Sequence, residues 1–139
     1  MKYIITLLLL AFSVYVNAQN ITVNINGIES AEGTIRLKVF TSSQDFDDNK
    51  AFKEVSFSKA KVKNGKLTVS LTLKSGTYGL SFLDDTNNNN KMDFNWMKMP
   101  EEGFGFSDFY LTGLSRPSFE DFDFTIKEGE QKTIEVKMR

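Results

Sequence analysis

The chain contains no cysteine and no histidine, and these two absences exclude several kinds of chemistry. Without cysteine it forms no disulfide, so packing has to stabilise the domain. Without histidine it cannot assemble a Ser-His-Asp or Cys-His nucleophile system, and a zinc site built from His and Cys is excluded as well. Carboxylates, hydroxyls, amides, lysines and aromatic rings are what remain for function.

Long helical patterns and an excess of one charge are also missing. No segment keeps helical periodicity for more than two turns, and the chain has no internal repeat. Its 17 basic residues nearly balance its 18 acidic residues, and loss of a leader containing Lys2 leaves 16 against 18, a net charge of −2. This balance predicts no nucleic-acid partner and no polybasic membrane patch.

The N-terminus has the pattern of a secretory signal. Lys2 precedes an apolar run over residues 4–12, and Ala18 supplies a small residue for cleavage. The run is shorter than the roughly 20 residues that a membrane span needs, and no cysteine follows it for lipid attachment. We therefore predict a signal peptide over 1–18, a mature domain over 19–139, and export to the periplasm or the extracellular space without stable membrane insertion.

Apolar and polar residues alternate along most of the mature chain, as in strands with one buried face. The alternating segments are residues 21–25, 35–39, 55–57, 67–73, 78–82, 122–126 and 134–138. Asn64-Gly65 is a strong signal for a two-residue hairpin turn, and the polar residues 41–50 predict a surface loop or a single helical turn. The spacing predicts an all-β fold, a single antiparallel β-sandwich of about seven strands.

One long segment, residues 84–120, departs from this strand pattern. It is rich in asparagine and aromatic residues, and it contains both prolines of the chain. A connection of this length in a compact domain is usually functional or ordered by an ion.

The start of the long segment has the spacing of a calcium loop. Asp85, Asn87, Asn89 and Asp93 occupy positions one, three, five and nine, and the carbonyl of Lys91 stands at position seven. Calcium takes six to eight oxygen ligands, and alternate residues of a tight loop supply them. These five residues are the predicted metal ligands, with Ca²⁺ as the only cofactor.

Two positions of this loop differ from the usual calcium motif. Position six is Asn90 in place of glycine, and asparagine tolerates the left-handed backbone region next best. Position twelve is Trp96, so the usual bidentate glutamate is missing; Asp84, Glu101 or Glu102 are candidates to fold back and replace it. The alternative is an Asn/Asp-rich turn that is closed by its own hydrogen bonds.

Aromatic residues gather in the second part of the segment. They are Trp96, Phe104, Phe106, Phe109 and Tyr110. One hypothesis is a stacking surface for a carbohydrate, a peptide or another apolar ligand. The alternative is that these rings pack over one open end of the sandwich core, where large aromatic side chains are most often found.

Glu102 is a further candidate binding residue. Together with Asp93 or Asp108 it could form the carboxylate pair of a glycoside hydrolase. Its neighbour Glu101 is poorly placed as a partner, because adjacent strand residues point to opposite faces. The sequence therefore ranks an enzyme below a binding or structural protein.

Four motifs in order resemble one bacterial family, the uncharacterised exported proteins called domain of unknown function 2141. The motifs are Ser75-Gly76-Thr77-Tyr78, Leu83-Asp84-Asp85-Thr86-Asn87 with Lys91-Met92-Asp93-Phe94-Asn95, Pro100-Glu101-Glu102-Gly103-Phe104-Gly105-Phe106-Ser107, and Pro117-Ser118-Phe119-Glu120-Asp121. The resemblance implies a small secreted β-sandwich, similar to transthyretin-like and collagen-adhesin B-type modules, with no activity attached.

Taken together, these observations predict an exported, non-catalytic β-sandwich module with a calcium-stabilised Asp/Asn loop. Its role would be binding or structural, in the cell envelope, with an envelope protein or a glycan as partner. The alternative functions are a carbohydrate- or peptide-binding module that uses the aromatic loop 96–110 and, ranked last, a carboxylate-dependent glycoside hydrolase.

Overall fold

The computed structural model describes residues 20–113 and 115–139, so the predicted signal peptide over 1–18 lies outside the described residues. Two short helices interrupt a series of strands. In chain order the elements are β1 (Ile21–Asn26), β2 (Thr34–Phe40), α1 (Ser43–Asp47), β3 (Lys53–Ser58), β4 (Leu67–Leu71), β5 (Gly76–Asp85), β6 (Phe104–Phe106), α2 (Phe119–Phe122), β7 (Asp123–Ile126) and β8 (Lys132–Lys137).

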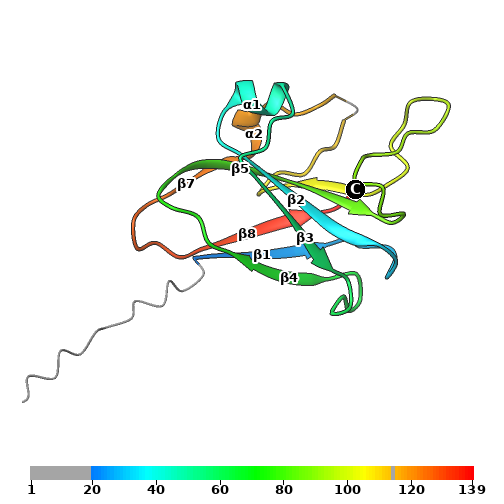
Figure 1. Cartoon of the computed structure of the whole chain (residues 1–139), viewed down its shortest axis with the longest axis horizontal. Coiled ribbons are helices and arrows are strands. Elements are labelled where there is room, and N and C mark those ends of the chain that lie inside the picture. The colour runs from blue at the N-terminus through cyan, green and yellow to red at the C-terminus, as the bar shows by residue number, and fades with distance from the viewer. Residues whose placement is uncertain (1–19, 114) are drawn as a thin grey trace, which may run out of the picture.

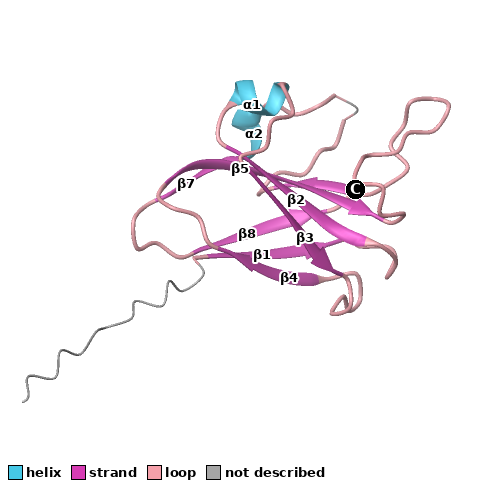
Figure 2. Cartoon of the chain, viewed as in Figure 1, coloured by secondary structure: helices cyan, strands magenta, loops and turns pink. Residues whose placement is uncertain are grey.

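The strands form two packed sheets, which confirms the predicted all-β sandwich (Figures 1 and 2). A three-stranded sheet has the order β4-β1-β8, and a five-stranded sheet has the order β3-β2-β5-β6 with β7 also paired to β5. The pairings are antiparallel except for that of β1 with β8, which is parallel. Alternation alone does not distinguish the two directions of pairing, since both have a side-chain period of two.

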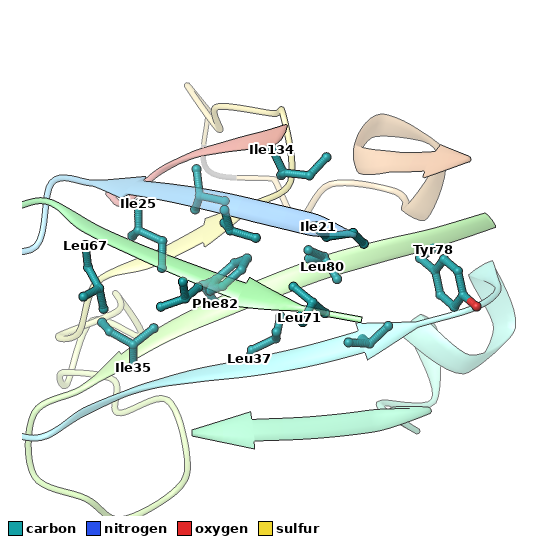
Figure 3. Close-up of a cluster of buried hydrophobic side chains, with 14 of the residues drawn as sticks. Ile21, Ile25, Ile35, Leu37, Leu67, Leu71, Tyr78, Leu80, Phe82 and Ile134 are labelled. Atoms are coloured by element: carbon teal, nitrogen blue, oxygen red, sulfur yellow. The ribbon is translucent and has the colours of Figure 1, made fainter. Parts of the chain in front are cut away.

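The main core lies between the two sheets and is built by the alternating apolar residues (Figure 3). Ile21 and Ile134 come from the three-stranded sheet, and Leu37 and Leu80 face them from the five-stranded sheet. All four are buried to 1% exposure or less. Burial of such a side chain contributes about 1.5–3 kcal/mol, so this alternation is what drives the sandwich to form.

The predicted hairpin turn at Asn64-Gly65 is present, but it does not join two strands of one sheet. Both residues have positive φ, 53° and 73°, as a two-residue hairpin turn requires. The turn closes a short bridge between Lys63 and Lys66. Because β3 belongs to one sheet and β4 to the other, the chain changes sheets at this turn.

A second, smaller core covers part of the outer face of the five-stranded sheet. The helices α1 and α2 lie together over this face (Figure 2). The Phe122 ring packs 5.0 Å from Phe46 and 4.9 Å from Phe106, measured between centroids. Gly79 permits this approach, because a Cβ there would stand 2.6 Å from the Phe122 ring. Of the two alternatives predicted for residues 41–50, a surface loop or a single helical turn, the structure has the helical turn, α1. Phe122, predicted to begin a strand, ends α2 instead.

Strand β6 lies within residues 84–120, the long segment that departs from the strand pattern of the sequence. Ser107 follows β6 and is fully buried. Its hydroxyl donates to the Phe122 carbonyl at 2.6 Å and accepts from the Leu80 amide at 3.0 Å. One side chain therefore joins β5, β6 and α2. Over 20–113 and 115–139, no helix is both long and apolar enough to cross a bilayer.

Candidate functional site

The Asp/Asn loop, residues 85–93, begins at the last residue of β5. The side chain of Asp85 stabilises the first turn of this loop. The Asp85 side chain is inaccessible to solvent, forms an ion pair with Arg36 on β2, and accepts hydrogen bonds from the amides of Asn89 and Asn90. Burial opposes ionisation of Asp85, but these hydrogen bonds outweigh it and lower the pKa of its carboxyl. Asn90 has φ of 62°, the left-handed conformation predicted for position six.

Three of the predicted calcium ligands converge within this loop. The amide nitrogens of Asn87 and Asn89 lie 2.6 and 2.8 Å from carboxylate oxygens of Asp93. The side-chain oxygen of Asn89 accepts from the Lys91 amide at 3.1 Å. The loop is therefore closed by its own hydrogen bonds, and in the part of the chain that the structure describes no three acidic side chains are grouped to hold a metal.

Glu102 is the carboxylate that folds back onto the loop. It is only 7% exposed, and it accepts from the amide and hydroxyl of Thr86 at 3.1 and 3.2 Å and from the Asp93 amide at 3.4 Å. It thus ties the start and the end of the loop together. Glu101 is exposed instead.

Asp84, the third candidate to complete the loop, points elsewhere. Its carboxylate forms an ion pair with Lys59, and both side chains are buried. Lys59 also donates to the carbonyls of Ser30 and Glu32 at 3.0 and 2.6 Å. Burial raises the pKa of Asp84, and the contact with Lys59 offsets part of this effect. Asp84 therefore stabilises the neighbouring β1–β2 connection.

A groove of about 570 Å³ lies on the outer face of the five-stranded sheet. Its floor is made of outward-facing residues on β2, β5 and β6, aligned by the strand register. They form two rows, Arg36–Leu83–Phe104 and Lys38–Ser81–Phe106. In each row a cation stands on β2 and an aromatic ring on β6.

The walls of the groove come from the helical region and from the first part of the long segment. The helical region contributes Phe46, Arg116 and Pro117, and the Asp/Asn loop with the residue that follows it contributes Lys91 and Phe94. In Figure 1 the helices and the yellow-green loop stand over the same side of the sheet. The Asp/Asn loop is thus one wall of the groove, and the bonds that order it also shape that wall.

The charged side chains that line the groove are all cationic: Arg36, Lys38, Lys91 and Arg116. Arg36 is bound to Asp85, and Lys38 lies 3.7 Å from Glu54 with its side chain 31% exposed. Lys91 is exposed and forms no ion pair with another described residue. Because the chain as a whole has a net charge of −1, these cations are a local feature of this face.

The predicted aromatic residues are divided among three places. Phe104 and Phe106 line the groove, and Phe109 packs beside them on the second core. Tyr110 lies over Lys137, whose Nζ is 4.4 Å from the ring centroid, at a separate shallow hollow. Trp96 is 91% exposed at the tip of a turn whose ends, Phe94 and Pro100, pair with each other.

Sequence reasoning missed the cations on the groove floor. Arg36 and Lys38 alternate with buried residues, which signals that they face outward. The pattern does not show what else stands over that face, because the helices and the Asp/Asn loop come from distant parts of the chain.

Fold and groove together define a small β-sandwich domain with an amphipathic groove on one sheet. The chain belongs to the family described as "Uncharacterized protein conserved in bacteria (DUF2141)", whose model matches residues 23–135. No curated protein and no solved structure is significantly similar to it.

Proposed function

We propose that this protein is an exported, non-catalytic binding module of the cell envelope, and that the groove is its binding surface. The observation that carries the proposal is the groove itself, at about 570 Å³. Small-molecule sites span roughly 300–1,000 Å³ and combine apolar walls with a few placed polar groups. Here aromatic rings in the floor and the walls supply the apolar surface, and polar groups come from β2, from β5 and from the walls.

The placement of the acidic residues supports a non-catalytic role. Glu102 is buried and accepts backbone hydrogen bonds from the loop that it closes, and Asp85 is bound to Arg36. Neither lines the groove. A glycoside hydrolase needs two carboxylates that flank its substrate, so the groove favours binding over hydrolysis.

A ligand screen with a blocked variant tests this proposal. Ser81 lies in the middle of the groove floor, and Ser81→Phe fills it. Melting temperatures would be measured against panels of glycans, short peptides and amphipathic small molecules. We expect at least one compound to stabilise the natural protein but not Ser81→Phe. Ser70→Phe is the matched control, because Ser70 is an exposed residue of β4. If every stabilising compound acts equally on Ser81→Phe, the groove is not the binding surface.

Export is tested separately, by sequencing the N-terminus of the protein recovered from outside the cytoplasm of an expressing bacterium. The proposed cleavage after Ala18 predicts a chain that begins at Gln19. An uncleaved chain retained in the cytoplasm would refute the export proposal and leave the groove proposal untouched.

We further propose that the Asp85–Asp93 loop binds calcium and thereby stiffens one wall of the groove. The supporting observation is that Asn87 and Asn89 already meet Asp93. A half-turn of each amide group exchanges its nitrogen for its oxygen, which would direct oxygen ligands to the same point. The Lys91 carbonyl, the remaining lone pairs of Asp85 and water would complete the set.

Melting with calcium and then with excess chelator tests this second proposal. Calcium at a hundredfold excess over its dissociation constant stabilises the native state by about 2.7 kcal/mol, on the order of 10 °C for a domain of this size. Asp93→Asn should lose most of this shift, and Glu101→Gln, an exposed acid nearby, should keep it. No shift in the natural protein, or an equal shift in Asp93→Asn, would show that the loop is an ordinary hydrogen-bonded turn.

A further inference from the structure

We propose that the ligand of the groove is an amphipathic carboxylate, a small molecule with one anionic head and an apolar body. This inference rests on the proposed binding function and specifies its ligand. It follows from the way in which charge and aromatic surface are distributed along the groove floor.

The apolar half of the groove lies over β6. Phe104 and Phe106 belong to the same three-residue strand and both line the groove. Phe106 packs against Phe46 and Phe122, at centroid distances of 6.4 and 4.9 Å. These rings are therefore held by the second core, and they offer a fixed apolar surface to the body of a ligand.

The cationic half lies over β2 and the Asp/Asn loop. Lys38 and Lys91 both line the groove. Lys91 forms no ion pair with another described residue, whereas Lys38 donates to Asn49 at 3.0 Å and lies 3.7 Å from the exposed Glu54. Arg36 stands in the neighbouring row, but it already neutralises Asp85. A ligand carboxylate in this half would therefore meet lysine side chains, and no acidic side chain of the described residues lines the groove to repel it.

Arg116 is a further cation of the groove, and it lies on the aromatic side. Its guanidinium lies 3.9 Å from the centre of the Phe46 ring, faces Asp47 at 3.5 Å, and donates to the Phe46 carbonyl at 2.7 Å. Stacked in this way, it extends the flat surface at the aromatic side. On the floor of the groove, the cations of β2 and the rings of β6 are thus separated by two strand spacings, about 10 Å.

Decanoate is a suitable probe, with decanol and decyltrimethylammonium as neutral and cationic controls of equal chain length. Binding would be measured by calorimetry below the concentrations at which micelles form. Fluorescence of Trp96, the only tryptophan, gives a second readout from the neighbouring turn. We expect decanoate to bind at least roughly tenfold more tightly than the cationic probe, with an advantage that weakens in high salt.

Three variants locate the binding. The double substitution of Lys38→Gln with Lys91→Gln should weaken decanoate about tenfold and leave decanol unchanged, because two partly exposed charge contacts contribute up to about 1 kcal/mol each. Lys61→Gln removes an exposed lysine that does not line the groove, and it should change nothing. Ser81→Phe should abolish binding of all three probes.

The outcomes separate this inference from the function on which it rests. Equal binding of the three probes, lost in Ser81→Phe, would overturn the charge preference and retain the binding groove. No binding of decanoate, while a glycan or peptide protects the natural protein but not Ser81→Phe, would overturn the inference alone. A concentration-dependent dimer that Ser81→Phe dissociates would also overturn it, because the occupant would then be a second copy of the chain.

Discussion

Replacement of Ser107 by alanine should destabilise the domain strongly, although it removes a single oxygen atom. Its hydroxyl is bonded to the Leu80 amide and to the Phe122 carbonyl, and all three residues are nearly or fully buried. Alanine leaves both backbone groups without a partner. An unsatisfied buried polar group costs about 1–3 kcal/mol, so we expect a loss of roughly 3 kcal/mol in the free energy of unfolding.

This loss is measurable by urea unfolding followed by far-ultraviolet circular dichroism. A fall of about 3 kcal/mol corresponds to a melting temperature lower by roughly 10 °C for a domain of this size. Ser70→Ala is the control, because Ser70 is exposed on β4 and should change stability by less than about 0.5 kcal/mol. A loss below about 1 kcal/mol in Ser107→Ala would show that water or a shift of α2 satisfies the two backbone groups, and the reasoning would be refuted.

Three further predictions follow from the same contacts. Gly79→Ala should cost about 1–3 kcal/mol by overpacking, since its Cβ would stand 2.6 Å from the Phe122 ring; an unchanged urea midpoint would contradict this. The pKa of Asp85 is lowered by folding, so its contribution to stability is full above the ordinary aspartate pKa and is lost as pH falls through the lowered value. Asp85→Asn should therefore flatten the acidic side of a stability profile measured from pH 7 to pH 3, and an equally steep profile would argue against it. Trp96→Ala should alter stability by less than about 0.5 kcal/mol, as its side chain is 91% exposed, and a larger loss would mean that the tip packs against the domain.

The strands were largely predictable because burial of one face of a sheet imposes a period of two on the sequence. Ile35, Leu37 and Val39 alternate with Thr34, Arg36 and Lys38, and β2 spans all of them. Strand β6 was not predictable, since Phe104-Gly105-Phe106 is too short for a pattern. Gly105 hides the alternation further, because a glycine has no side chain whose character marks the buried face.

The Asp/Asn loop was predictable in outline. The left-handed backbone of Asn90 and the convergence of Asn87 and Asn89 on Asp93 follow from local spacing. The carboxylate that closes the loop was not decided by spacing, because three acids were available. The fold selects Glu102, since the Asp84 side chain lies against Lys59 and Asp85 against Arg36.

By itself, the sequence determined the all-β class, the separation of apolar from polar faces and the composition of the loop, because these depend on residues close together in the chain. Only the tertiary structure decided the groove. Its floor joins β2 to β6 across some 65 residues of chain, a separation about which local periodicity carries no information. Cations and aromatic rings that look like ordinary surface and core residues become one amphipathic surface only when β5 pairs with both strands.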